Sequence, residues 1–192
     1  MTETEILEHF RATGALLEGH FQLSSGLHSP QYLQCALALR HPRDAARFGY
    51  AIAERFAEQK FDAVISPAIG GLIIGFVVAQ SLGVPFFWTE RENGAMTVRR
   101  GFSVGENEKL LVVEDVITTG GSTRECIAAV EKLGGQVVAA ASIVDRSGGA
   151  ANVGVPRAAL ATLNVPTFQP ENCPMCARGE TAVKPGSRVR GK

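Results

Sequence analysis

The sequence predicts an α/β fold, in which a mainly parallel sheet is flanked by helices and preceded by a small N-terminal unit. Between residues 61 and 144, short apolar runs alternate with helix-like segments, which is typical of strand–helix–strand units with right-handed crossovers. The apolar runs are nearly continuous, as expected of strands that are buried on both faces. With 192 residues, 45% of them hydrophobic, the chain can bury one sizeable core, so we expect one domain.

The first third of the chain predicts a helix, a hairpin and a second helix. Residues 4–17 and residues 42–58 repeat apolar side chains at helical spacing. Between them, residues 21–35 predict a short hairpin, because a Ser-Ser-Gly turn sequence ends at Gly26 and Pro30 suits an edge strand.

Strands and helices alternate through the rest of the predicted domain. We expect strands at residues 61–66, 84–88, 110–117 and 137–144, and helices at residues 71–82 and 122–133. The polar, glycine-bearing segment 90–108 predicts a long loop, which is often a lid or a binding loop. Ligands of such sheets bind beyond the carboxyl ends of the strands, which selects residues 67–71, 89–100, 118–122 and 145–149.

The predicted organisation is a single unit with three parts. Residues 1–40 form an N-terminal helix and hairpin, residues 41–170 form the α/β core, and residues 171–192 form a tail with a Cys-x-x-Cys pair. Lys plus Arg and Asp plus Glu both number 19, so the net charge is zero. We therefore expect small-molecule partners, with no bulk attraction to nucleic acid or to an anionic membrane.

The composition also predicts where the protein works. The apolar stretch 61–88 is divided by prolines and glycines into pieces shorter than the roughly 20 residues that span a bilayer. The chain has four cysteines and starts with an acidic segment that does not resemble an export signal. We expect a cytoplasmic protein with reduced thiols.

The strongest chemical signal is the segment LLVVEDVITTGGST, residues 110–123. A buried strand runs into two adjacent carboxylates, Glu114 and Asp115, and then into a turn rich in hydroxyls and glycines. Glycines allow a ligand to approach the backbone, and the start of the following helix offers free N–H groups, so the turn suits a phosphate. The carboxylates suit sugar hydroxyls, and they would stabilise positive charge on a ribose. A Walker A loop is excluded by the lack of lysine, and residues 70–75 lack the spacing of a dinucleotide fingerprint.

VVEDVITTGGST resembles the phosphoribosyl-pyrophosphate motif of the type I phosphoribosyltransferases. The alternative, an ordinary strand–turn–helix with a solvated acid pair, leaves the composition of the turn unexplained. Within the family the chain most resembles the orotate-specific members, over nearly its whole length. FQLSSGLHSPQYLQ resembles their N-terminal hood hairpin, SPAIGG resembles their pyrophosphate-side loop, and IVDR resembles the strand end that meets the base.

The resemblance implies a reaction and its partners. The ribose 5-phosphate of phosphoribosyl pyrophosphate would be transferred to orotate, giving orotidine 5′-phosphate and pyrophosphate in the biosynthesis of UMP and other pyrimidine nucleotides. The enzyme would act as a homodimer, with Mg²⁺ held mainly through the pyrophosphate.

The resemblance also implies roles for individual residues. Catalysis would involve Glu114, Asp115, Arg99 and Arg100. Phosphoribosyl pyrophosphate would be bound by Glu114, Asp115, Val116, Ile117, Thr118, Thr119, Gly120, Gly121 and Ser122. Orotate would contact Thr118 and Arg146, and the pyrophosphate side would be formed by Arg91, Ile69 and Gly70.

Two departures from the family pattern concern cations. Many bacterial members carry lysine where this chain has Ser24, and their mobile loop holds lysines and a histidine. Here the corresponding loop, TERENGAMTVRRGF at residues 89–102, has arginines as its only basic residues. It resembles a subfamily with an arginine-bearing loop.

Several residues have a plainer alternative interpretation. Arg146 follows Asp145, so the two residues could form a local ion pair. His20 and His28 are interpreted as surface residues of the hairpin. Cys173 and Cys176 offer at most half of a four-ligand zinc site, whose second pair could come from a dimer partner, and we expect instead an unpaired structural or redox-labile pair.

Two other functions stay open at this point. One is a phosphoribosyltransferase for a purine or uracil; Arg146 together with the hood favours orotate, because only orotate carries a ring carboxylate that needs a cationic partner. The other is a regulator that binds an effector without turnover, which would usually carry an added DNA-binding module.

Overall fold

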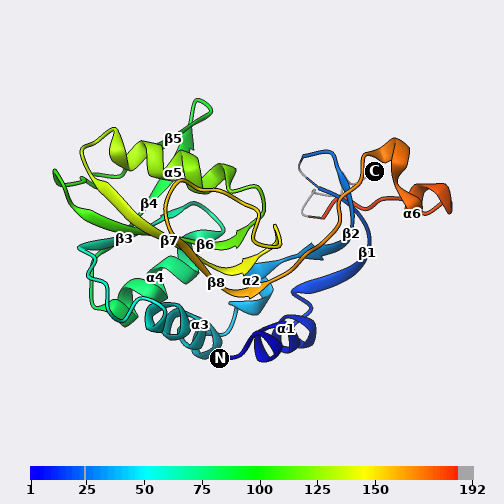
Figure 1. The fold of residues 1–192 in the computed structure, drawn as a ribbon, viewed down its shortest axis with the longest axis horizontal. Helices are drawn as coiled ribbons and strands as arrows, with labels where there is room; N and C mark the ends of the chain where they lie inside the picture. Colours follow the sequence, from blue (N-terminus) through cyan, green and yellow to red (C-terminus); the bar gives the residue numbers. More distant parts are fainter. Residues whose placement is uncertain (24, 186–192) are drawn as a thin grey trace.

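The computed structural model describes residues 1–23 and 25–185, and its main feature is a six-stranded sheet with helices on both faces (Figure 1). The strand order is β5-β4-β3-β6-β7-β8, and every neighbouring pair is parallel except the hairpin of β4 and β5. The strands are β3 (Ala63–Pro67), β4 (Phe86–Glu92), β5 (Ala95–Val98), β6 (Lys109–Ile117), β7 (Gln136–Asp145) and β8 (Arg157–Thr162). The predicted fold class is confirmed.

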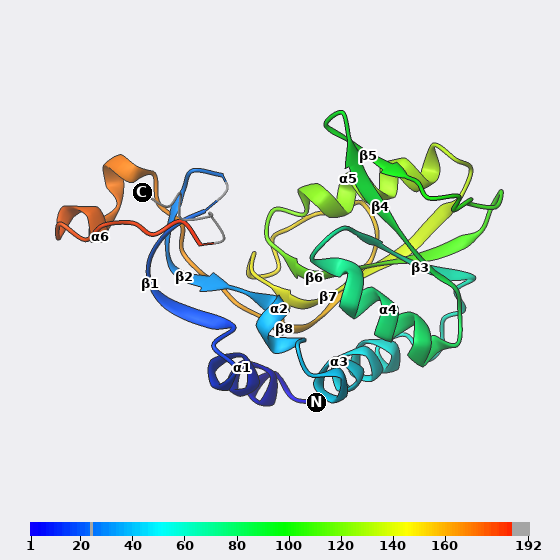
Figure 2. The same cartoon turned by 180° about the vertical axis from the view of Figure 1, so that it is seen from behind.

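The two faces of the sheet are covered by different helices (Figures 1 and 2). Helices α3 (Pro42–Glu54) and α4 (Gly71–Leu82) lie on one face, and α5 (Gly121–Glu131) lies on the other. Along β6, Leu111 and Val113 join the core beneath α3 and α4, whereas Leu110 and Val112 join the core beneath α5. This alternation of buried side chains explains why the central strands are apolar throughout.

The N-terminal unit consists of α1 (Glu3–Ala12), a separate two-stranded sheet of β1 (Leu16–Gln22) and β2 (His28–Leu33), and the short helix α2 (Cys35–Ala38). Thr2 caps α1 through a reciprocal hydrogen-bond pair with Glu5. Gly14, with a φ of 70°, then lets the chain turn into β1. The first helix is therefore shorter than predicted, and the hairpin begins earlier.

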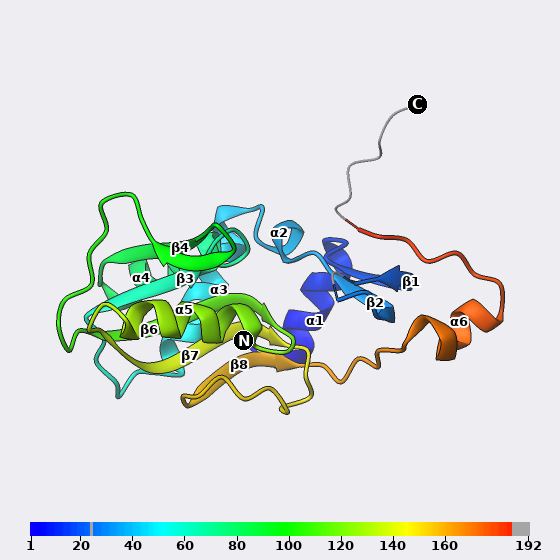
Figure 3. The ribbon, with the colours of Figure 1, turned by 90° about the horizontal axis from the view of Figure 1, so that it is seen from above.

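The segment after β8 runs back along the hairpin of β1 and β2, as seen from above in Figure 3. After β8, Phe168 pairs with His28 of β2, and Val183 pairs with Phe21 of β1. Between these two contacts lie the single-turn elements η1 (Pro170–Asn172) and α6 (Pro174–Ala177). Residues 164–185 are thus a strap over the hairpin, a contact that the sequence did not predict.

The prediction of a loop at residues 90–108 is wrong in its first half. β4 continues to Glu92, and β5 pairs with it in antiparallel register. β8 was also missed, because its sequence RAALAT contains no aromatic residue and only one β-branched residue, Thr162, whereas strands are usually rich in both. Helix α4, by contrast, has the predicted bounds. Within the described residues, no helix is both long and apolar enough to cross a bilayer.

Candidate active site

The turn between β6 and α5 forms a small polar cavity of about 250 Å³. Gly120 has a φ of 73°, and a Cβ there would lie 2.7 Å from Cγ1 of Val153, so both the conformation and the space require glycine. A Cβ on Gly121 would meet only Oγ1 of Thr119, at 3.6 Å. Backbone N–H groups at the start of α5 suit an anion in this cavity. It is lined by Arg91, Glu114, Val116, Ile117, Thr118, Thr119, Gly120, Gly121, Ser122 and Glu125.

The two adjacent carboxylates sit where β6 ends, and both are partly buried. Oε2 of Glu114 accepts a hydrogen bond of 2.7 Å from the Thr123 hydroxyl, and Oδ1 of Asp115 accepts one of 2.8 Å from the Val116 N–H. Burial raises the pKa of Glu114 to about 7, and it also raises the pKa of Asp115 above its usual range. Without a ligand, part of the Glu114 population is therefore protonated at neutral pH. A cation or hydroxyl donors would restore the charge.

The loop between β3 and α4 approaches the same carboxylates. A Cβ on Gly70 would lie 2.8 Å from Oδ1 of Asp115, so the backbone of this loop lies directly against the acid pair. Ile69, the residue before it, projects into solvent. The structure thus brings Gly70, in the segment 67–71 that was expected at the carboxyl edge of the sheet, next to Asp115.

A second cavity of about 550 Å³ lies beside the first, and the two share Val116, Thr118 and Thr119. Residues from the hood hairpin and from the segment after β8 close it. Its lining is Leu23, Ser25, Leu27, Tyr32, Leu33, Val116, Thr118, Thr119, Arg146, Ser147, Asn164, Val165 and Thr167. Ser24, within the hairpin turn, lies outside the described residues, as do residues 186–192 of the basic tail.

Arg146 is the cation of this larger cavity. Its Nη2 donates to Oγ of Ser29 at 2.6 Å and to the carbonyl of Gln31 at 3.1 Å, while its buried Nε has no hydrogen-bond partner in the structure. Burial lowers the pKa of the guanidinium. Among the residues that the structure describes, no carboxylate forms an ion pair with it.

The alternative in which Arg146 pairs with Asp145 is wrong. The Asp145 carboxylate binds Nη1 of Arg157 at 2.8 Å and accepts two hydrogen bonds from Ser147. A buried cation with an unpaired N–H favours a bound anion, because leaving such a donor unsatisfied is costly.

The three arginines of the β4–β5 region are held by neighbouring acids. Arg91 lines the small cavity and forms a close ion pair with Glu125 of α5. Arg99 binds Glu92 at 3.1 Å, and Arg100 forms a close hydrogen-bonded pair with Glu90. Hydrogen bonds from Arg100 and from the Trp88 indole lower the pKa of Glu90. Arg99 and Arg100 line neither of the two cavities.

Some residues that line the site were not predicted from the sequence. Tyr32 and Ser29 lie in the segment that resembled the hood, but nothing in their spacing indicated that they face Arg146. Asn164, Val165 and Thr167 follow the missed strand β8 and carry no motif. Recognising β8 would have placed them at the carboxyl edge of the sheet, where ligands bind.

Comparisons with known proteins agree with this geometry. Residues 39–155 match the model of the phosphoribosyl transferase domain family. The chain is 53% identical, over 98% of both chains, to an orotate phosphoribosyltransferase of Desulforamulus reducens. Its structure is similar to that of orotate phosphoribosyltransferase from Aeropyrum pernix, with a TM-score of 0.69, 28% identity, and coverage of 82% of this chain and 93% of that one. A similar structure from Mycobacterium tuberculosis, in complex with 5-phospho-alpha-D-ribosyl 1-diphosphate, has a TM-score of 0.67 and 27% identity, and covers 84% and 96% of the two chains.

Proposed function

This chain belongs to the orotate phosphoribosyltransferase family, and we propose that it transfers the ribose 5-phosphate of phosphoribosyl pyrophosphate to orotate, forming orotidine 5′-phosphate and pyrophosphate. The observation that carries the choice of base is the guanidinium of Arg146 in the larger cavity, whose Nε has no hydrogen-bond partner and which pairs with no carboxylate among the described residues. Orotate has a ring carboxylate, and a charge-assisted pair with arginine would satisfy both groups. Uncharged bases would leave this guanidinium without an anionic partner.

The two adjoining cavities suit the two halves of the product. The small polar cavity would hold the 5-phosphate on the backbone of residues 118–122, and the larger one would hold the base. Thr118 borders both cavities and would contact both halves. The ribose would then lie between them, next to Glu114.

Glu114 and Asp115 would act on the ribose. As pyrophosphate leaves, the ring gains oxocarbenium character, and carboxylates that hold the ring hydroxyls would stabilise this positive charge. Their oxygens also fit Mg²⁺, a hard cation that prefers oxygen ligands, and its charge would favour their ionised forms. When bound, Mg²⁺ would neutralise charge on the departing pyrophosphate.

The pyrophosphate would leave on the side of Ile69 and Gly70. Arg91 already lines the phosphate cavity, and Arg99 and Arg100 would join it by releasing their glutamate partners when the β4–β5 region closes. Closure would exclude water from the reactive ribose cation.

We also propose that the enzyme is a homodimer and works in the cytoplasm. Exposed apolar side chains gather on α3 and α4, namely Tyr50, Ile73 and Phe76. Large exposed apolar side chains on helices are typical of subunit interfaces. All four cysteines are free thiols in the structure, which fits a reducing compartment.

The test is Arg146→Ala, assayed with phosphoribosyl pyrophosphate, Mg²⁺ and either orotate or uracil. We expect orotate use, measured as kcat/KM, to fall about ten- to a hundredfold, equivalent to the loss of one charge-assisted hydrogen bond. The slow use of uracil should barely change. Arg146→Lys keeps the charge but not the planar fork, so its kcat/KM for orotate should lie between those of the wild type and Arg146→Ala. An equal loss for both bases would show that Arg146 is structural and would remove the argument for orotate.

A further inference from the structure

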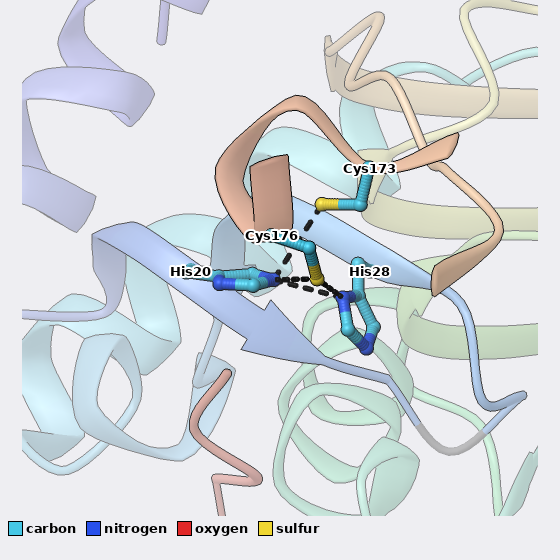
Figure 4. Close-up of side chains that lie close together, drawn as sticks. All are labelled: His20, His28, Cys173 and Cys176. Carbon is cyan, nitrogen blue, oxygen red and sulfur yellow. Dashed lines mark hydrogen bonds between the residues drawn. The ribbon is translucent and has the colours of Figure 1, made fainter. Parts of the chain in front are cut away.

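Four side chains distant in sequence meet between the hairpin and the strap: His20 of β1, His28 of β2, and Cys173 and Cys176 at the start of α6 (Figure 4). One potential ligand atom from each residue lies within 4.8 Å of all the others. Both histidines are buried, at 6% and 7% exposure, so their interpretation as surface residues is wrong. The hairpin supplies the second pair that the Cys-x-x-Cys sequence lacked.

The distances approach those of a tetrahedral metal centre. Nε2 of His20 lies 3.5 Å from Sγ of Cys173 and 3.7 Å from Sγ of Cys176, and Nδ1 of His28 lies 3.3 Å from Sγ of Cys176. A tetrahedral Zn²⁺ site with ordinary bond lengths would separate nitrogen and sulfur ligands by about 3.6 Å and two nitrogen ligands by about 3.3 Å. The two histidine nitrogens are 2.8 Å apart, so a small opening of the cluster would admit the ion.

Hydrogen bonding alone does not account for the cluster. Nδ1 of His28 and both sulfur atoms converge on the same atom, Nε2 of His20. A neutral imidazole nitrogen has one lone pair and accepts one hydrogen bond, so three neighbours cannot all be satisfied through it. A cation between the four atoms would satisfy all of them.

The surroundings fix the orientation of His20 for such a role. Its other ring nitrogen, Nδ1, lies 2.9 Å from the carbonyl oxygen of Glu180. A carbonyl only accepts hydrogen bonds, so Nδ1 carries the proton and Nε2 presents its lone pair to the cluster. Metal-binding histidines in proteins are typically held by this kind of bond on the far nitrogen.

We propose that His20, His28, Cys173 and Cys176 bind one structural Zn²⁺ ion. Two histidines and two cysteines are a common ligand set of closed, four-coordinate zinc sites, and soft thiolates exclude Mg²⁺. Binding releases the protons of the two thiols, which leaves a neutral site of Zn²⁺ and two thiolates in this largely buried position. The site is separate from the proposed chemistry of Glu114 and Asp115.

The ion would fix the strap to the hairpin next to the larger cavity. His20 and His28 flank the turn whose Leu23, Ser25 and Leu27 line that cavity, while Val165 and Thr167 of the strap line it from the other side. Zinc would therefore hold both walls in place without touching a substrate.

The test measures metal in the full-length protein, purified without chelator under reducing conditions and, separately, reconstituted with Zn²⁺. We expect about one zinc per chain by plasma mass spectrometry. Cys176→Ser and His20→Gln should each lower the zinc content at least tenfold. Cys126→Ala and His41→Gln, which change a buried cysteine and an exposed histidine outside the cluster, should retain it.

A second measurement uses only the wild-type protein, so it tests the site even if the variants fail to fold. Co²⁺ added to the metal-free wild-type protein should give the intense ligand-field bands of tetrahedral coordination together with a thiolate charge-transfer band. Removal of the metal should speed hydrogen exchange in residues 16–33 and 164–183. If the reconstituted wild-type protein holds less than about a tenth of an ion per chain, or if Cys173 and Cys176 are found joined in a disulfide, the proposal is overturned.

Discussion

Glu114 combines a buried position with a role that needs its negative charge. Its pKa of about 7 in the empty site predicts that kcat/KM rises with pH and levels off above about 7, because this parameter reports the ionisation of the free enzyme. Glu114→Gln should lower turnover at least tenfold and abolish that acid limb. The measurement is a pH profile of kcat/KM at one fixed Mg²⁺ concentration that leaves the acid pair of the free enzyme unsaturated, and an acid limb that persists in the variant would contradict the assignment.

The same raised pKa has a consequence for stability. The Glu114 carboxyl binds its proton more tightly in the folded state than in the unfolded state. Its contribution to the free energy of unfolding is therefore greatest below the unfolded pKa and falls as pH rises toward about 7. Glu114→Gln lacks this titration and should exceed the wild type in stability above pH 7, on the order of 1 to 3 kcal/mol, with a smaller difference at low pH. Urea denaturation of the wild type and of Glu114→Gln at several pH values measures the two free energies of unfolding. If their difference does not change with pH, the burial argument is contradicted.

Gly120 and Gly121 are adjacent but should respond differently to substitution. A side chain at Gly121 has open space and enters the phosphate cavity, so Gly121→Val should fold and bind phosphoribosyl pyrophosphate at least tenfold more weakly. Gly120→Val places a branched residue at positive φ against Val153 and should lower the melting temperature instead. Calorimetric titration and thermal unfolding separate the two effects. Wild-type affinity in Gly121→Val would exclude a phosphate at this turn.

At the scale of elements, the sequence predicted the site better than it predicted the segments that enclose it. The β6–α5 motif is local, because the strand, the two acids, the turn and the start of the helix follow one another within 14 residues. Its chemistry can therefore be predicted without knowledge of the fold. The strap depends on contacts between residues more than 100 positions apart, such as His28 with Phe168. No local pattern encodes such pairings, and for that reason the strap, the fourfold cluster and the walls of the larger cavity were missed. Strand β8 pairs with β7, which precedes it in the chain, and was missed because of its alanine-rich sequence.

The β4–β5 hairpin and the residues after it should respond to ligand. Antiparallel pairing already protects residues 89–98, so we expect phosphoribosyl pyrophosphate with Mg²⁺ to slow hydrogen exchange chiefly in residues 99–105. Arg99→Ala and Arg100→Ala should each lower turnover at least tenfold, whereas Arg43→Ala on α3 should not. Equal exchange with and without ligand would rule out closure of this segment.

At the scale of the whole molecule, the exposed face of α3 and α4 predicts the oligomeric state. Phe76, 58% exposed on α4, should lie in the dimer interface, so Phe76→Glu should give monomers. Leu133, 49% exposed just after α5, is a matched control, and Leu133→Glu should leave the dimer intact. Sedimentation velocity distinguishes the outcomes, and a dimer that survives Phe76→Glu would place the interface elsewhere.

The contacts between the strap and the hairpin also have a consequence for the order in which the chain folds. The hairpin leaves the ribosome well before its partners, Phe168 and Val183, have been synthesised. The parallel core has its strands in place once Thr162 has been synthesised, whereas the contacts of the strap with the hairpin form only after Phe168 and Val183 have followed. A nascent chain that has not yet reached Phe168, or a chain clipped before it, would therefore hold the assembled β6–α5 turn beside a larger cavity whose walls are not yet fixed, so the proposed base site would be completed after the proposed phosphate site.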